Sequence, residues 1–198
     1  MDNKRIFDIL LASFGLIVLS PVFVVIAILI LLDSNGGIFY RQIRVGKNVE
    51  DFPMLKFRTM YVHPKDQQLL TIGDHDTRIT KIGYWLRKYK LDEFPQLLNV
   101  LRGHMSLVGP RPQVRKWVNL YNDDQLMVLS VKPGITDWVS IQFANEGKLL
   151  EQCEDPEQFY IQELIHLKVA QNLEYINKND FWTDLKIIFL TFRKIIIR

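Results

Sequence analysis

The chain has 198 residues, of which 25 are Lys or Arg and 22 are Asp or Glu, so its formal net charge is +3. A hydrophobic content of 48% argues against a disordered chain, and the single cysteine, Cys153, excludes an intrachain disulfide framework. This small net charge argues against a nucleic-acid partner, and the sequence lacks the Walker A, dinucleotide-binding and serine-hydrolase motifs.

The N-terminal segment 9–32 carries no charged residue, and as a straight helix it would be about 36 Å long, enough to cross a membrane. Ser20 and Pro21 interrupt its middle, where proline kinks a helix because it lacks a backbone N–H. Basic residues flank both ends and favour the cytoplasmic side. We therefore expect a re-entrant, helix-break-helix membrane segment over residues 1–34; a kinked transmembrane helix is the alternative.

Residues 38–45 and 55–60 are rich in β-forming residues and predict a small hairpin around a Gly-Lys-Asn turn. In the second strand the period of two places Lys56 and Arg58 on the same face. Two cations on one strand face either bind an anion or simply face solvent, and the spacing alone leaves both readings open.

Two helices are predicted after the hairpin, over residues 82–89 and 92–102, and Gly103 would end the second. Asp92 would be the N-cap of that helix, with Glu93 in its first turn. The helix dipole and nearby cations should then lower the pKa of Asp92 and keep it ionised. Such a carboxylate suits a nucleophile or a Mg²⁺ ligand, although an N-cap acid beside a solvated run of charges is the simpler alternative.

The second half of the chain is predicted to be mainly helical. Residues 105–108 predict a short strand, and the following Gly-Pro-Arg-Pro fixes the backbone on both sides of Arg111. Residues 132–136 predict a turn, and Asp155 would cap a long helix that ends near residue 177.

Residues 181–198 combine apolar residues at helical spacing with several basic ones, which predicts an amphipathic helix on a membrane surface or against the core. The predicted fold is α+β, mostly helical with a small β-hairpin. It divides into a membrane segment (1–34), a globular domain (35–180) and an interfacial helix (181–198).

Four of these segments occur together in one known family. KFRTM at 56–60, LDEFPQLLNV at 91–100, SLVGPRP at 106–112 and PGIT at 133–136 resemble the motifs of the bacterial sugar transferase family. They come in the family's order and, with further matches, span nearly the whole chain. The chain looks like the small monotopic phosphoglycosyl transferases of that family, whose re-entrant helix is broken by a Ser-Pro pair like Ser20-Pro21.

The resemblance implies transfer of a sugar-1-phosphate from a UDP-sugar to polyprenol (undecaprenyl) phosphate, with release of UMP and with Mg²⁺ as cofactor. It implies a ping-pong mechanism through a covalent phosphosugar on Asp92, with Glu93 assisting through the metal or a proton; both residues are candidate metal ligands. The residues implied to bind the phosphates or the nucleotide are Lys56, Arg58, Arg87, Pro110, Arg111 and Pro112.

The resemblance also implies a location and further partners. The site would lie at the cytoplasmic face of the bacterial inner membrane, in contact with membrane lipids, at the first membrane step of glycan assembly. Downstream glycosyltransferases would be possible partners.

One stretch departs from the family's pattern. After Pro-Gly-Ile-Thr, relatives commonly continue Gly-Trp-Ala-Gln-Val-Asn-Gly-Arg, whereas here Asp137 replaces the glycine and Ala144 stands at the position of the arginine. We expect this stretch to affect donor specificity rather than the reaction class. Two other functions remain alternatives: a membrane-anchored, non-catalytic scaffold of a glycan assembly complex, and a membrane phosphohydrolase that uses the same aspartate with water.

Overall fold

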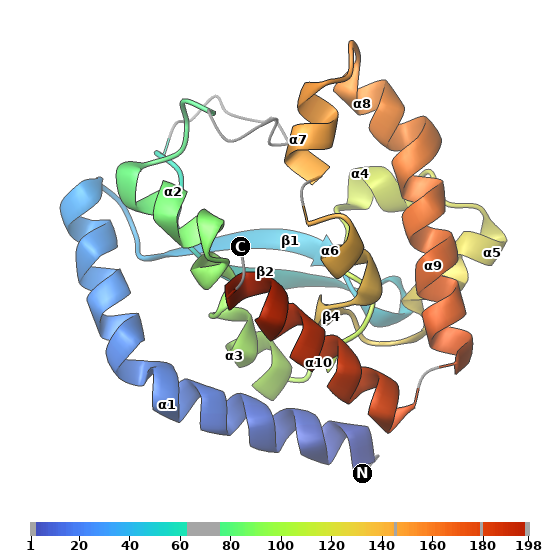
Figure 1. The fold of residues 1–198 in the computed structure, drawn as a ribbon, viewed down its shortest axis with the longest axis horizontal. Helices are drawn as coiled ribbons and strands as arrows, with labels where there is room; N and C mark the ends of the chain where they lie inside the picture. Colours follow the sequence, from blue (N-terminus) through green and yellow to red (C-terminus); the bar gives the residue numbers. More distant parts are fainter. Residues whose placement is uncertain (1–2, 63–75, 145, 179, 197–198) are drawn as a thin grey trace.

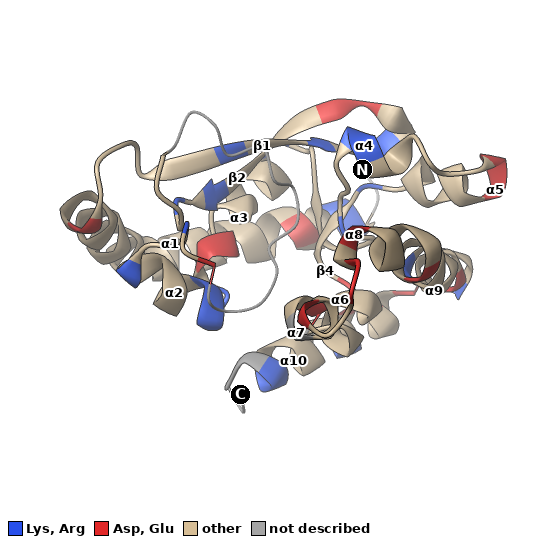
Figure 2. Cartoon of the chain, turned by 90° about the horizontal axis from the view of Figure 1, so that it is seen from above, with Lys and Arg blue, Asp and Glu red and all other residues tan. Residues whose placement is uncertain are grey.

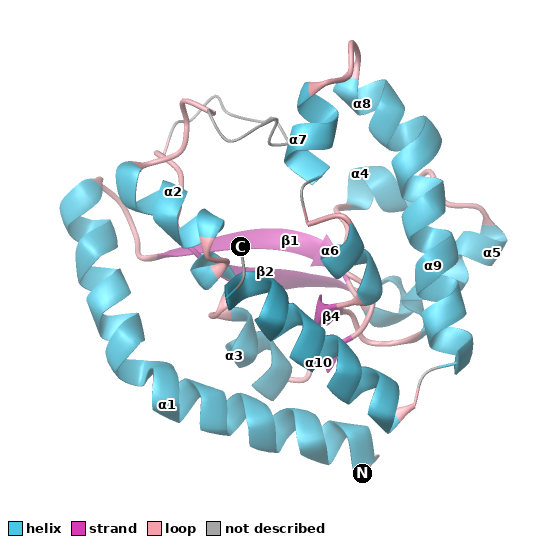
Figure 3. Cartoon of the chain, in the orientation of Figure 1, coloured by secondary structure: helices cyan, strands magenta, loops and turns pink. Residues whose placement is uncertain are grey.

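The computed structural model describes residues 3–62, 76–144, 146–178 and 180–196. The chain is mostly helical with two small sheets, as Figures 1 and 3 show, which confirms the predicted class. After the hairpin the helical elements are α2 (Lys81–Lys88), a 3₁₀ turn (Leu91–Glu93), α3 (Gln96–Leu101), α4 (Arg115–Val118), α5 (Asp123–Leu126), a second 3₁₀ turn (Met127–Ser130), α6 (Trp138–Gln142), α7 (Glu146–Glu151), α8 (Pro156–Phe159), a π-helical turn (Tyr160–Leu164), α9 (Ile165–Lys178) and α10 (Phe181–Ile196).

The N-terminal helix α1 (Asn3–Asp33) bends sharply near its middle (Figure 1). Pro21 lies inside it and cannot donate a backbone hydrogen bond, while the Ser20 hydroxyl donates to the Ile17 carbonyl at 2.8 Å. The predicted break is therefore a kink within one continuous helix. Among the described residues α1 is the one helix long and apolar enough to cross a membrane, and most of its side chains are not buried.

The N-terminal end of α1 is held by the globular part of the chain. Lys4 forms an ion pair with Asp184 of α10. Arg5 donates hydrogen bonds to the carbonyls of Val100 and Leu101, at 2.6 and 3.1 Å, where α3 ends. These polar contacts place the start of α1 beside α3 and α10.

The C-terminal end of α1 is held by the same globular part. Asp33 Oδ2 accepts a hydrogen bond from the Ile82 backbone N–H in the first turn of α2, at 2.9 Å. The buried guanidinium of Arg58 donates to three carbonyls where the helix ends, those of Ile30, Ser34 and Asn35, and the Ile30 carbonyl also accepts from Ser34 N. Both ends of α1 therefore return to one domain.

The hairpin pairs β1 (Phe39–Val45) with β2 (Asp51–Phe57) in antiparallel register, with Tyr40 opposite Lys56. This confirms the predicted hairpin, although β2 begins four positions earlier than expected. A 3₁₀ turn over Lys47–Val49 reverses the chain tightly enough that Asp51 already pairs with Val45.

A second small sheet was not predicted. β3 (Ser106–Val108) pairs in parallel with β4 (Gly134–Thr136), so the turn predicted at residues 132–136 is wrong. Gly134 is needed there because the backbones approach closely: a Cβ on it would lie 2.1 Å from the Gly109 nitrogen. The glycine that suggested a turn therefore marks a strand contact instead.

We expect Gly134→Ala to destabilise the protein by about 3 kcal/mol, because the new methyl group would collide with backbone atoms that cannot rotate away. The melting temperature should fall by about 6–12 °C in thermal unfolding of the detergent-solubilised protein. Gly37→Ala is the matched control, since a Cβ there meets only one atom, at 3.9 Å. Equal melting temperatures for the two variants would show that the β3–β4 contact is looser than described.

The core cluster that positions the site joins β2, α3, β3, α10 and the first half of α1. Its buried members include Phe52 of β2, Val100 of α3, Val108 of β3, Ile187 of α10 and Ala12 of α1. The site described below therefore rests on elements from both ends of the chain.

The predicted C-terminal helix is confirmed as α10, and it has two different faces. Ile187 is fully buried, whereas Trp182, Phe189 and Phe192 are largely exposed. In Figure 2 its last turn, beside the C-terminus, is blue because it carries Arg193 and Lys194. The helix therefore both packs on the core and presents aromatic and basic side chains outward.

Candidate active site

Asp92 and Glu93 lie in the 3₁₀ turn between α2 and α3. Lys90, just before it, has φ 58° in the left-handed region, which reverses the chain after α2. The turn closes a hydrogen bond from Phe94 N to Leu91 O at 3.2 Å, and α3 begins only at Gln96. The prediction that Asp92 caps a helix over 92–102 is therefore wrong, although the chain does leave α3 at Gly103, with φ +87°.

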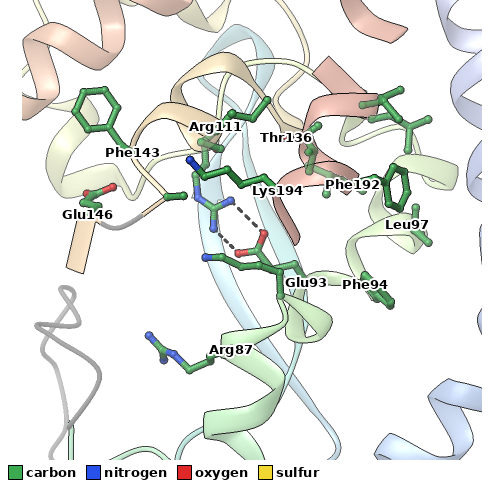
Figure 4. Close-up of a pocket in the computed structure, with 18 of the residues that line it drawn as sticks. Arg87, Glu93, Phe94, Leu97, Arg111, Thr136, Phe143, Glu146, Phe192 and Lys194 are labelled. Carbon is green, nitrogen blue, oxygen red and sulfur yellow. Dashed lines mark hydrogen bonds and ion pairs between the residues drawn. The ribbon is translucent and has the colours of Figure 1, made fainter. Parts of the chain in front are cut away.

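Glu93 is buried between two cations. Lys56 Nζ donates to its Oε1 at 2.9 Å. The Arg111 guanidinium donates to both carboxylate oxygens, with Nη1 to Oε2 at 3.2 Å, and Figure 4 shows this Arg111–Glu93 contact. Burial by itself would raise the pKa of Glu93, but the two cations outweigh it and hold that pKa well below its usual range. Glu93 is therefore an ionised anchor that fixes Lys56 and Arg111.

Asp92 has the opposite environment. It is 7% exposed, and its Oδ1 atom has no hydrogen-bond partner among the described residues. Burial raises the pKa of Asp92, and the positive charges of Lys56, Lys90 and Arg87 only partly oppose this. The expected lowering of that pKa is therefore wrong, because the carboxylate is desolvated rather than set at an exposed helix start.

A cavity of about 1130 Å³ opens beside Glu93, and its lining has two parts. The apolar part includes Phe14 and Val18 of α1, Leu97 of α3, and Ile188 and Phe192 of α10, together with Phe94, Val114, Leu150 and Tyr160. The cationic part includes Arg44, Arg87, Lys88, Lys90, Arg111 and Lys194. Figure 4 shows Arg111 and Glu93 between Leu97 and Phe192 on one side and Phe143 and Glu146 on the other.

Three predicted site residues line this cavity: Glu93, Arg111 and, from α2, Arg87. Lys56 is not a lining residue, but it is bonded to Glu93, which Arg111 also contacts. Pro110 and Pro112 are buried on either side of Arg111, and the Pro112 carbonyl accepts a hydrogen bond from Arg44 at 3.1 Å. The carboxylates differ, since Glu93 is a lining residue and Asp92 is not.

Arg58 lies apart from this group. Its guanidinium donates hydrogen bonds to the Ser34 and Asn35 carbonyls at the end of α1. Arg58 is not a lining residue of the cavity. The phosphate-binding role that the resemblance implies for Arg58 remains a prediction, while the structure gives it a visible role in fixing α1.

Asp137 was marked in the sequence only as a departure from the family's pattern. Its side chain is fully buried, and Oδ2 accepts a hydrogen bond from the Arg111 backbone N–H at 3.1 Å. Its Oδ1 accepts from Ser140 N at 2.6 Å and caps α6. The departure therefore lies directly against a residue of the site. An Asp directly before a helical segment is a preferred N-cap residue, and this was the signal that could have indicated the cap.

The family described as bacterial sugar transferase matches the chain over residues 2–198. The chain belongs to the bacterial sugar transferase family.

Three relatives differ in length and in the names they carry. One from Escherichia coli is named UDP-glucose:undecaprenyl-phosphate glucose-1-phosphate transferase; it is 38% identical over 95% of this chain and 39% of its own length. One from Aeromonas hydrophila is named UDP-N-acetylgalactosamine-undecaprenyl-phosphate N-acetylgalactosaminephosphotransferase; it is 33% identical over 98% of this chain and 43% of its own length. One from Bacillus subtilis, an uncharacterized sugar transferase named EpsL, is 34% identical over 100% of this chain and 89% of its own length. The chain thus spans about two fifths of the first two relatives.

Proposed function

We propose that the protein transfers a sugar-1-phosphate from a UDP-sugar to polyprenol phosphate, such as undecaprenyl phosphate, and releases UMP. The two-part cavity carries this proposal. Its apolar wall, built partly from α1, suits a polyprenyl chain, and its cations suit phosphate groups. The names of the E. coli and A. hydrophila relatives describe reactions of this class.

The reaction would proceed in two displacements at one phosphorus. An Asp92 oxygen attacks the β-phosphorus of the donor, and the bond from that phosphorus to the bridging oxygen breaks, so that UMP leaves. A phosphate oxygen of polyprenol phosphate then attacks the same phosphorus, and the bond to Asp92 breaks, which regenerates the carboxylate and leaves a polyprenol diphosphate sugar. Attack requires the Asp92 carboxylate to turn toward the cavity that Glu93 already lines.

The cations have separate tasks in this scheme. Lys56 and Arg111 are held in place by Glu93, while Arg87 enters the cavity from α2. Together they would neutralise phosphate oxygens while charge shifts to the leaving group. Because donor and acceptor both present a phosphate, one set of cations can serve them in turn, which supports a ping-pong order.

Mg²⁺ is the proposed cofactor, and the two carboxylates fit it unequally. Asp92 Oδ1 is a buried carboxylate oxygen without a partner, the kind of ligand that Mg²⁺ prefers, whereas both Glu93 oxygens are bonded to cations. Asp92 would hold the ion together with donor phosphate oxygens, and Glu93 would join only by exchanging a cation. When bound, the ion would neutralise phosphate charge. The described residues contain no group of three or more metal-ligating side chains.

We propose that α1 is re-entrant, so that both of its ends lie on the cytoplasmic side of the bacterial inner membrane. Two observations support this topology. Lys4 and Arg5 at one end, and Asp33 at the other, are tied to the same globular domain. Large apolar residues along α1, such as Phe14, Val24 and Leu32, are exposed and available to lipid. The aromatic and basic face of α10 would then lie at the headgroups.

Substituted-cysteine labelling tests this topology. In a Cys153→Ser background, Asn3→Cys and Tyr40→Cys are expected to react with a membrane-impermeant maleimide in inside-out vesicles and to be protected in right-side-out vesicles. Both positions are exposed and lie beyond opposite ends of the apolar stretch. Labelling of the two cysteines from opposite faces would establish a transmembrane α1 and contradict the re-entrant topology.

Release of UMP separates the proposed transferase from the two alternatives. Purified full-length protein with Mg²⁺ and a uridine-labelled UDP-sugar should release UMP catalytically only when polyprenol phosphate is added, and EDTA should stop it. A scaffold would release none. A phosphohydrolase would release UMP catalytically without the lipid acceptor. The product of the transferase would be a substrate for downstream glycosyltransferases.

A further inference from the structure

The far end of the cavity holds an ion pair that the proposed phosphate chemistry does not use. Lys168 of α9 donates from Nζ to Oε2 of Glu146, the first residue of α7, at 2.5 Å. The same Nζ lies 4.9 Å from the centre of the Tyr160 ring and 5.9 Å from that of Phe143. All four side chains line the cavity.

The placement of this pair is unusual for a purely structural contact. Lys168 is 9% exposed, and removing two charges from water is costly enough that a buried ion pair rarely adds much stability. The Glu146 side chain remains 29% exposed. Figure 4 shows Glu146 and Phe143 on the side of the cavity opposite Leu97 and Phe192. The carboxylate is therefore within reach of a ligand in the cavity.

We propose that Glu146, Lys168 and Phe143 form the subsite for the sugar of the donor. This inference rests on the proposed function and specifies which part of the donor occupies the end of the cavity away from α1. With the phosphates beside Arg111 and the polyprenyl chain against α1 and α10, the end of the cavity that holds the Glu146–Lys168 pair is left for the sugar or the uridine of the donor.

The chemistry of the three side chains fits a sugar better than uracil. A carboxylate accepts hydrogen bonds from hydroxyl groups, an ammonium donates to hydroxyl or acetamido oxygens, and an aromatic ring packs against a sugar's C–H face. The pairing edge of uracil carries two carbonyl oxygens on either side of one N–H, and a carboxylate facing that edge would be repelled by both. Glu146 therefore favours the sugar.

The subsite includes residues of the stretch 137–146, which departs from the family's pattern. Phe143 and Glu146 follow Asp137, which replaces the family's usual glycine and is bonded to Arg111. The names of the two longer relatives specify different donor sugars, glucose and N-acetylgalactosamine. A sugar subsite built from these residues would make donor choice a property of this stretch and of α9.

Calorimetric binding of UDP, UDP-glucose, UDP-N-acetylglucosamine and UDP-N-acetylgalactosamine to the full-length protein tests the subsite without requiring turnover. Glu146→Gln and Lys168→Met should each raise the Kd of the preferred UDP-sugar at least tenfold and change the ratio of this Kd to those of the other UDP-sugars. The Kd for UDP should change less than twofold. Glu146→Asp should recover part of the preference. Melting temperatures identify any variant that fails to fold. If Glu146→Gln or Lys168→Met does not fold, the Kd values of Glu146→Asp are compared with those of the wild type instead.

The control is an exposed ion pair on the same helix, Lys178 with Glu174 at 2.8 Å. Glu174→Gln and Lys178→Met should leave every Kd unchanged. If Glu146→Gln and Lys168→Met weaken the binding of UDP and of all UDP-sugars equally, this end of the cavity binds uridine and the proposal is overturned. Unchanged ratios between the Kd values of the UDP-sugars would also overturn it. Failure of the proposed function would be seen separately, as a wild-type protein that binds donors but releases no UMP.

Discussion

Asp92→Asn is expected to lower sugar-phosphate transfer by about 10³-fold or more, because the amide has nearly the same shape but cannot form an acyl phosphate. The same substitution should not lower the melting temperature. Asp92 is 7% exposed and burial raises its pKa, so the folded protein bears a cost for the ionised form that a neutral amide avoids. Loss of activity without loss of stability is the combined expectation.

The measurement pairs a UMP-release assay with thermal unfolding in the same detergent. Asp124→Asn is the matched control, since Asp124 is an exposed residue of α5 outside the cavity, and it should change neither quantity. Turnover of Asp92→Asn within about tenfold of the wild type would remove Asp92 from the role of nucleophile. A large fall in melting temperature would instead indicate that the carboxylate has a structural partner.

Glu93→Gln is expected to lower both stability and activity, in contrast to its neighbour. Glu93 pairs with Lys56 at 2.9 Å and with Arg111, so the neutral amide would leave two cations facing each other in a buried site. Removing one member of a buried charge network costs about 3 kcal/mol. Transfer should fall by about 10²-fold, because the cations that face the phosphates would no longer be fixed.

Thermal unfolding should show a melting temperature about 6–12 °C below the wild type for Glu93→Gln. Glu157→Gln is the control, since Glu157 also pairs with a lysine, Lys116, but both side chains are 52% exposed. An exposed pair of this kind contributes about 1 kcal/mol or less. If the two variants melt at the same temperature, the Lys56–Glu93–Arg111 network is solvated rather than buried.

The sequence indicated which charged residues lie together better than it indicated their environment. Lys56, Glu93 and Arg111 come from three separate family motifs, and the structure places their side chains in contact, while their roles in the reaction stay predictions. The environment of Asp92 could not be predicted, because it depends on burial by elements distant in sequence. Local pattern suggested an exposed helix cap, whereas the chain forms a buried 3₁₀ turn.

Other differences have the same origin in contacts between distant segments. Gly134 was interpreted from its neighbours as part of a turn, but its role is to let β4 approach the backbone at Gly109. Arg58 was grouped with Lys56 by strand alternation, but it meets the end of α1. No local pattern pointed to Lys168, because its interest depends on the ion pair with Glu146, which lies on another helix.

The most direct test of the account is intact-protein mass spectrometry after incubation with a UDP-sugar and Mg²⁺ but without polyprenol phosphate. We expect a mass increase of one phosphosugar on up to one residue per chain, located by peptide mapping to Asp92, with an equal amount of UMP released. Addition of polyprenol phosphate should remove the adduct. Rapid transfer to the lipid with no adduct on Asp92, and with UMP formed only when both substrates are present, would contradict the covalent mechanism.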